Sequence, residues 1–194
     1  MNQTQFLQNF HHLRQVDAEQ DFPLRRAAKK AAVLCPVVCR DELTVLFTKR
    51  ASHLKHHAGQ ICFPGGRYEQ HDSSLMETAL RETEEEIGLS RHYTKVVGNL
   101  QTFKTVSGYE VTPYVGLIEP DFDLRPDANE VEQVFEVPLA YLVDRNNHIA
   151  EPVKRNGVSY SIYFIPWQDT FIWGATAAFV RILSNHLVAP TSTH

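Results

Sequence analysis

Three glutamates near the middle of the chain, Glu82, Glu85 and Glu86, are spaced so that one helix face would carry all of them. Side chains three and four apart on a helix have Cβ atoms about 5 to 6 Å apart, so these carboxylates would repel one another. A divalent cation such as Mg²⁺ relieves the repulsion, because it binds carboxylate oxygens and keeps waters and substrate phosphates at its other positions. Arg81 could hold Glu85 by an ion pair, and Glu84 falls on a different arc. The spacing alone favours a solvated acidic face and leaves a metal site for phosphate chemistry as the alternative, which the surrounding residues must decide.

The residues around these glutamates predict the helix that positions them. Ser74 followed by Glu77 matches a capping box, so the helix should begin near Leu75. Gly88 suits the left-handed cap conformation at its end. The helical period predicts a buried stripe made of Met76, Ala79, Leu80, Thr83 and Ile87.

The same stretch resembles the Nudix box, a glycine followed by an acidic residue and then R-E-x-x-E-E-x-G. The matching residues are Gly66, Asp72, Arg81, Glu82, Glu85, Glu86, Gly88 and Leu89. Asp72 stands where the family usually has glutamate, and one extra residue separates it from Arg81. Both departures fall in the loop before the helix, so they bear on Asp72 and leave the helix carboxylates unchanged.

Just upstream, a second stretch resembles the signature of Nudix coenzyme A pyrophosphatases. The matching residues are Leu46, Thr48, Arg50, Ala51, Gly59, Phe63, Pro64, Gly65 and Gly66. Phe47 replaces a usual leucine, and Lys55 replaces a usual arginine, which keeps the charge but loses the planar fork.

The resemblance also implies roles for particular residues. It implies Mg²⁺ or Mn²⁺ as cofactor, and the expected metal ligands are Glu82, Glu85, Glu86 and, from a loop outside the box, Glu130. Surface charge is the alternative for Glu130. The catalytic residues implied are Glu85 or Glu82 as general base, together with Arg81. The implied substrate contacts are Arg50, Lys49, Arg67, Gly65 and Gly66.

The function implied is hydrolysis of the pyrophosphate bond of coenzyme A to 3′,5′-ADP and 4′-phosphopantetheine. The main alternative is a Nudix pyrophosphatase that acts on another nucleoside diphosphate derivative, such as NADH or ADP-ribose. A Nudix fold that binds without catalysis would be expected to have lost box glutamates, and all three are present here.

The composition narrows the kinds of partner and the cellular compartment to be expected. The net charge is −4 with no basic stripe, which argues against a nucleic-acid partner and favours a small-molecule substrate. Three cysteines without zinc-like spacing indicate buried free thiols in a reducing compartment, and no signal peptide or membrane span is evident. We therefore expect a cytoplasmic protein without a membrane partner and leave a homodimer open.

The hydrophobic patterning predicts one mixed sheet flanked by helices, an α/β (α+β) fold, and the resemblance implies a Nudix-like α/β/α sandwich. We expect an N-terminal helix and linker over residues 1–30, one domain over 31–188 and a tail over 189–194. Helices are predicted over residues 4–14, 140–144 and 174–187. Strands are predicted over residues 31–39, 43–49, 61–63, 94–103, 109–118, 129–137, 148–154 and 158–165.

Overall fold

The computed structural model describes residues 1–12, 29–155 and 157–188. The chain begins with helix α1 (Gln3–His11), whose capping box is formed by Asn2 and Gln5. Phe6 and Phe10 are buried, as the helical spacing predicts. Leu13, the linker and the tail of the expected domain plan lie outside the described residues.

Eight strands of the described residues form the main sheet, here called sheet A, with the order β3-β2-β1-β7-β5. Strand β4 pairs with β1, β6 with β7, and β8 with β2. The long β1–β7 ladder is parallel and the other ladders are antiparallel, so the predicted mixed sheet is confirmed. The strands are β1 (Lys29–Val38), β2 (Thr44–Arg50), β3 (Ile61–Cys62), β4 (Gly65–Arg67), β5 (Thr94–Asn99), β6 (Phe103–Lys104), β7 (Tyr109–Ile118) and β8 (Val131–Pro138).

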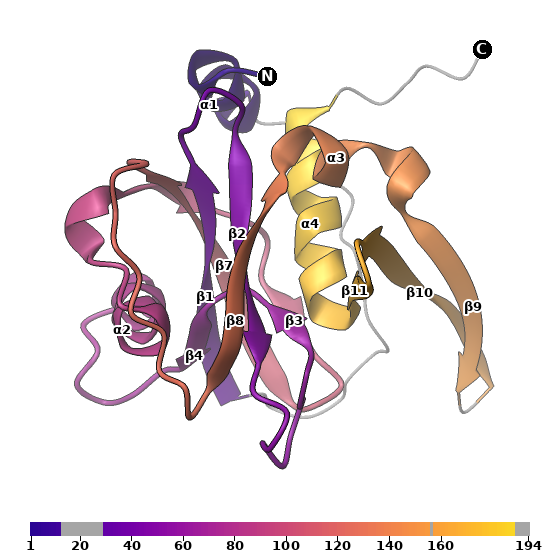
Figure 1. Ribbon diagram of the computed structural model, residues 1–194. Coiled ribbons are helices and arrows are strands. Elements are labelled where there is room, and N and C mark those ends of the chain that lie inside the picture. The colour runs from indigo at the N-terminus through magenta and orange to yellow at the C-terminus, as the bar shows by residue number, and fades with distance from the viewer. Residues whose placement is uncertain (13–28, 156, 189–194) are drawn as a thin grey trace.

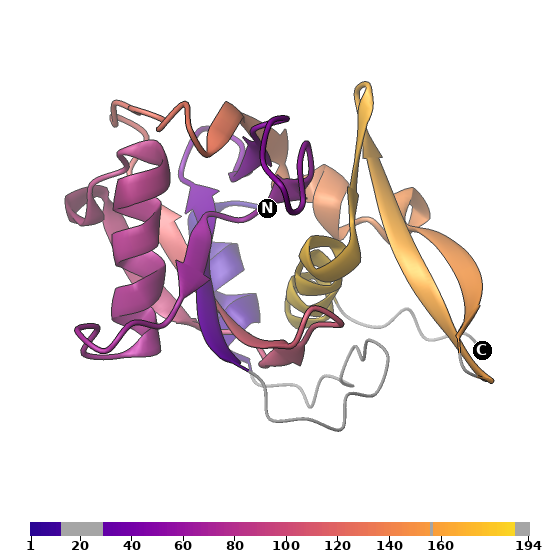
Figure 2. The same ribbon diagram turned by 90° about the horizontal axis from the view of Figure 1, so that it is seen from below.

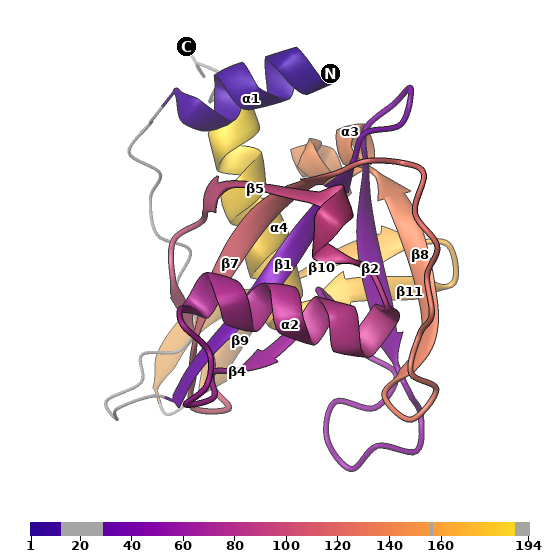
Figure 3. The ribbon, with the colours of Figure 1, turned by 90° about the vertical axis from the view of Figure 1, so that its left-hand side faces the viewer.

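Helices cover both faces of sheet A, which gives the predicted α/β/α sandwich (Figure 1). Helix α2 (Leu75–Ile87) runs across one face, as Figure 3 shows from that side. Helices α3 (Leu139–Val143) and α4 (Gly174–Leu187) pack on the other. Because successive strand residues point to opposite faces, Ala32 and Leu34 of β1 join the core under α2, whereas Ala31 and Cys35 join the larger core under α4.

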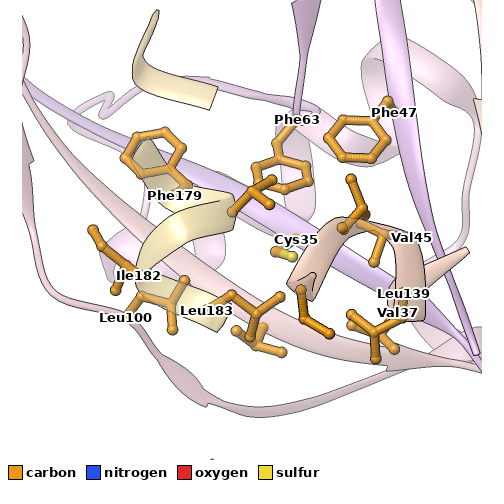
Figure 4. Packing of buried hydrophobic residues seen from close by; sticks show 14 of the residues in the cluster. Cys35, Val37, Val45, Phe47, Phe63, Leu100, Leu139, Phe179, Ile182 and Leu183 are labelled. Atoms are coloured by element: carbon orange, nitrogen blue, oxygen red, sulfur yellow. The ribbon is translucent and has the colours of Figure 1, made fainter. Parts of the chain in front are cut away.

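Aromatic rings form much of the core under α4 (Figure 4). Phe63 stacks on Phe47 with ring centroids 4.8 Å apart, and Phe179 lies 6.4 Å from Phe63. Phe179 also meets Phe103 edge-on. These contacts tie α4 to β2 and to the segment between β3 and β4, so the strands that lead into the glycine-rich stretch are anchored from the face opposite α2.

The ends of α2 follow the sequence prediction, and its buried face differs in part. Ser74 accepts a hydrogen bond from the Glu77 backbone, while the Glu77 carboxylate pairs with Arg91, so only one half of the capping box forms. Gly88 adopts the left-handed cap with φ 69°. Met76 is 41% exposed and therefore does not belong to the buried stripe.

Two local features differ from what residue type suggests. Glycine disfavours strands, yet Gly65 and Gly66 belong to the short strand β4, which pairs with β1. Glu84, on the other arc of α2, binds both the backbone and the guanidinium of Arg91. Cys35 is buried as expected, whereas the other free thiols are half-buried. Within the described residues no helix has the length and apolar character that a membrane crossing needs.

A second, three-stranded antiparallel sheet, sheet B, contains β9 (Ile149–Arg155), β10 (Val158–Trp167) and β11 (Thr170–Trp173). The predicted 148–154 and 158–165 hairpin is therefore present, and its tip residue Asn156 lies outside the described residues. Sheet B stands on the far side of α4 from sheet A, as Figure 2 shows. Helix α4, whose bounds match the prediction, is thus enclosed between two sheets.

Candidate active site

Strand β4 brings two glycines against the acidic face of α2. A Cβ atom added at Gly66 would lie 2.3 Å from Cδ of Glu82, so only glycine permits this approach. The Gly65 N–H donates a 3.1 Å hydrogen bond to Oε2 of Glu86. The glycine pair therefore allows two of the three box carboxylates to reach the sheet backbone.

Glu86 is a buried carboxylate with little compensation. Burial raises the pKa of Glu86 to about 8, and the Gly65 N–H and the charge of Arg50 oppose that rise. Nη1 of Arg50 lies 3.7 Å from Oε1 of Glu86. A buried anion is costly unless a cation or hydrogen-bond donors stabilise it, so this position suits a group that binds a positive ion.

Arg81 connects the remaining acidic residues of the site. Its Nε donates to Oδ1 of Asp72 at 2.8 Å, Nη2 lies 3.0 Å from Oε1 of Glu82, and Nη1 donates to Oε2 of Glu85 at 2.9 Å. The expected Arg81–Glu85 pair is therefore formed, and two further carboxylates share the guanidinium. Because Asp72 is buried and also accepts from the Thr78 hydroxyl, the aspartate in the shifted loop position still anchors the arginine.

The electrostatics differ among these carboxylates. The Arg81 guanidinium holds the pKa of Asp72 well below its usual range. Burial raises the pKa of Glu82, although Arg81 opposes the shift. The Glu85 side chain is 59% exposed and lies at the open end of the group. Glu85 is therefore the most accessible of the three box glutamates, while Glu82 and Glu86 lie against the glycine strand.

The three basic residues expected to contact the substrate lie in different surroundings. The Nε atom of Arg50 is buried and has no hydrogen-bond partner among the described residues. Lys49 instead donates to Glu132 at 2.5 Å. Arg67 pairs with Ala31, whose side chain belongs to the core under α4, so Arg67 leaves β4 on the face away from α2. Of the three, only Arg50 lies beside the box carboxylates.

Glu130 comes from the loop before β8, outside the box. It is exposed, and its charge raises the pKa values of Glu82 and Glu86, so it lies within electrostatic range of both. Its backbone oxygen accepts from the N–H of Ala51, the residue after Arg50. Glu130 therefore approaches the same site from a third chain segment.

The loop between β7 and β8 is tied to the end of α2, which the sequence did not predict. The N–H of Arg125 donates to the oxygen of Ile87 at 2.8 Å, and that of Asp127 donates to the oxygen of Glu86 at 2.9 Å. These backbone bonds satisfy carbonyls at the helix terminus. Side-chain type carries no signal for such bonds, because any residue with a backbone N–H could form them.

The donor set suits a hard divalent cation, because all its ligand atoms would be carboxylate oxygens. The described residues hold no group of three acidic, imidazole or thiol side chains already gathered at metal-binding distances. Mg²⁺ is usually held by one or two carboxylates together with waters and substrate phosphates. Glu82, Glu86 and Glu130 are the carboxylates that could hold such an ion here.

Comparison with known proteins matches the NUDIX domain to residues 28–157, which include β4, α2 and Glu130. The chain belongs to the Nudix family. Nudix hydrolase NudL of Yersinia enterocolitica is 42% identical over 157 residues, which cover 81% of this chain and 80% of the relative. NudL of Yersinia pestis is 40% identical over 159 residues, with 82% and 80% covered.

A solved structure shares the fold at lower identity. The MutT/nudix family protein from Enterococcus faecalis superposes with a TM-score of 0.54 at 18% identity, covering 95% of this chain and 67% of that chain. Membership of the family makes the chain a Nudix pyrophosphatase, an enzyme of a class that generally uses divalent metal cations.

Proposed function

We propose that this Nudix enzyme hydrolyses the pyrophosphate bond of coenzyme A and its derivatives, giving 3′,5′-ADP and 4′-phosphopantetheine. The observation that carries the proposal is the meeting of two motifs. Arg50, from the stretch that resembles the coenzyme A pyrophosphatase signature, lies 3.7 Å from Glu86 of the Nudix box. Substrate recognition and metal binding would therefore share one site.

In this proposal Glu82, Glu86 and Glu130 hold Mg²⁺ or Mn²⁺. The bound ion would neutralise phosphate charge and lower the pKa of a bound water. Glu85 is the preferred proton acceptor because it is the most exposed box glutamate, and Arg81 orients it. Glu82 is the second candidate for this role, because Arg81 also pairs with it.

Arg50 would bind a substrate phosphate. Its Nε is buried without a hydrogen-bond partner among the described residues, although guanidinium donors are usually satisfied when they are buried. A phosphate oxygen would supply the missing acceptor, and Arg binds such oxygens with two parallel bonds. The proposal therefore assigns substrate contact to Arg50 ahead of Lys49 and Arg67.

The test is a panel of coenzyme A, dephospho-coenzyme A, NADH and ADP-ribose, assayed with Mg²⁺ and with Mn²⁺ and analysed by product mass. A cation that binds the 3′-phosphate should favour coenzyme A over dephospho-coenzyme A by about tenfold to a hundredfold in kcat/KM. The product masses should place the cut between the two phosphates. A preference of about tenfold for NADH or ADP-ribose would contradict the coenzyme A assignment and leave the Nudix chemistry in place.

A variant pair tests the role of Arg50. Arg50→Lys should lower kcat/KM because the charge stays but the two-pronged contact is lost. Arg40→Lys is the matched control, because Arg40 pairs with Glu136 on the surface, away from the box. Equal kcat/KM in the two variants would contradict a phosphate contact from Arg50.

A further inference from the structure

Sheet B is apolar on both of its faces. Ile165 and Ile172, which pair across β10 and β11, are fully buried in the core under α4. On the opposite face Phe164 lies between Ile149 of β9 and Trp173 of β11. A sheet with one face in solvent normally alternates apolar and polar residues. This second face therefore departs from the pattern of a solvated surface.

The outer face of sheet B, as we call it, contains Ile149, Glu151, Val153, Tyr160, Ile162, Phe164, Pro166, Phe171 and Trp173. Strand pairing places these residues on one side. Phe171, Trp173 and Ile149 are 51%, 40% and 45% exposed. Phe164 stacks on Trp173 at 6.1 Å and meets Phe171 edge-on at 6.3 Å. The aromatic side chains thus form one continuous group at the surface.

The exposed area is large enough to be the centre of an interface. Because an aromatic side chain has about 150 to 250 Å² of surface, the exposed parts of Phe171 and Trp173 contribute roughly 100 Å² each. With the other apolar members the face reaches roughly 500 Å², near the upper end for the largest patch on a monomer. A stable interface takes about 800 Å² from each partner, including a polar rim around an apolar centre.

We propose that this face is a homodimer interface, in which the outer faces of two copies of sheet B pack on each other across a two-fold axis. Two apolar sheet faces pack well at about 10 Å separation, with strand directions set by the sheet twist. Two-fold dimers are the commonest soluble oligomers and use the same patch on both subunits. The apolar area given by one copy matches what the centre of such an interface needs.

Charge argues against other occupants. Strand pairing gives the outer face positions for two charged residues of opposite sign, Glu151 and Arg155. Nucleic acids and anionic membranes are bound through clusters of lysine and arginine, and these positions form no such cluster, so neither is favoured here. In Figures 1 and 2 sheet B lies on the opposite side of the molecule from α2. The dimer would therefore leave both active sites open.

The experiment measures molar mass by light scattering and sedimentation velocity for the full chain at tens of micromolar. The expected value is twice the chain mass of 22.2 kDa. Phe171→Lys and Ile149→Lys should each shift the protein to monomer, because each places a charge in the apolar centre. Ser161→Lys is the matched control: Ser161 lies on the same sheet but is exposed on the opposite face, so this variant should remain a dimer.

Retained hydrolase activity in all three variants shows that each is folded. A wild-type protein that stays at 22.2 kDa overturns the proposal and leaves the face to a different partner. A dimer that survives both Phe171→Lys and Ile149→Lys also overturns it, because the interface then lies elsewhere. Loss of the dimer in Ser161→Lys alone would place the interface on the other face of sheet B and would likewise refute the assignment.

Discussion

Helices α2 and α4 pack on opposite faces of the same sheet but are held there by different forces. Among the buried residues of α2 are Thr78, Thr83 and Glu86, which are polar. Those of α4 are mainly apolar, with Phe179 and Leu183 among the largest. The N-terminus of α2 is capped by the Ser74 side chain, whereas the N-terminus of α4 has no side-chain cap. Capping and ion pairs thus position the charged helix, and apolar burial positions the other.

This difference assigns different roles to the two faces of sheet A. A helix held mainly by apolar packing adds stability through the area that it removes from water. A helix that buries a carboxyl group loses stability at that position, and the group gains its charge where a cation compensates the burial. Substitutions on α2 should therefore change activity more than stability, and substitutions under α4 should do the reverse.

The largest expected effect comes from Glu86→Gln on α2. The change keeps the shape and the hydrogen bond from Gly65 but removes a charge that would hold the metal. We expect kcat to fall about 100- to 1,000-fold, the cost of removing one electrostatic contribution to a transition state. The unfolding temperature without metal should not fall, because Glu86, with its pKa raised to about 8, is mostly neutral near pH 7 and the glutamine oxygen still accepts from Gly65. Steady-state kinetics and calorimetry measure the two outcomes.

Glu84→Gln is the matched control on the same helix. Glu84 faces Arg91 and not the glycine strand, so the variant should lose little activity and only part of a surface ion pair. Equal losses of kcat at both positions would show that the carboxylates of α2 do not divide into a catalytic and a structural group.

The next effect should appear in stability when Leu183 of α4 is truncated. Leu183 is fully buried, so Leu183→Ala should lower the free energy of unfolding by about 2 to 5 kcal/mol while kcat stays near the wild-type value. Denaturant titration and steady-state assays measure both. Met76→Ala on α2 is the control, and its exposure predicts a change within about 0.5 kcal/mol. A large fall in the free energy of unfolding for Met76→Ala would show that Met76 is packed as part of the buried stripe.

The same contrast explains what the sequence could predict. The ends of α2 follow from Ser74 and Gly88, whose preferences are local, and the bounds of α4 follow from the apolar period. The Arg81–Glu85 pair also follows from spacing of four along one helix. Each of these predictions needs only neighbours within one or two turns.

Other features of the structure depend on partners that are distant in the sequence. Gly65 and Gly66 look like a break because glycine disfavours strands, but pairing with β1 overrides that preference. The side chain of Arg67 lies on the face of sheet A away from α2, a direction set by the strand register that pairs it with Ala31. Lys49 is engaged by Glu132, far along the chain. Local pattern carries none of this information, since register and pairing are set by tertiary packing.

A third prediction concerns Gly66, the residue of sheet A that lies against the Glu82 side chain of α2. Gly66→Ala should lower kcat/KM by about tenfold to a hundredfold, because the new Cβ displaces the Glu82 carboxylate that now lies against the glycine. Stability should change little, since the displaced atoms are the end of a flexible side chain. In the double variant with Glu82→Gln the losses should not add. Additive losses would mean that Gly66 acts independently of Glu82.

The smallest expected effect is on pH-dependent stability, through Asp72. Asp72→Asn removes the charge that pairs with Arg81, and we expect a loss of about 1 to 3 kcal/mol near neutral pH, as for a hydrogen bond to a charged group. The folded-state pKa of Asp72 lies below its unfolded value, so the carboxylate contributes stability above the unfolded value of about 4.

That contribution must disappear as the pH falls through the unfolded pKa towards the folded one, because the folded state then loses its advantage in holding the ionised form. Denaturant titrations of the wild type and Asp72→Asn between about pH 7 and pH 3 should therefore show a stability difference that narrows on acidification. The Thr78 and Glu69 donors to Asp72 remain available to the asparagine oxygen, whereas the amide NH2 cannot accept from Nε of Arg81, so the loss falls on the pair with Arg81. A difference that stays constant over this range would assign the contribution of Asp72 to packing and not to its ion pair with Arg81.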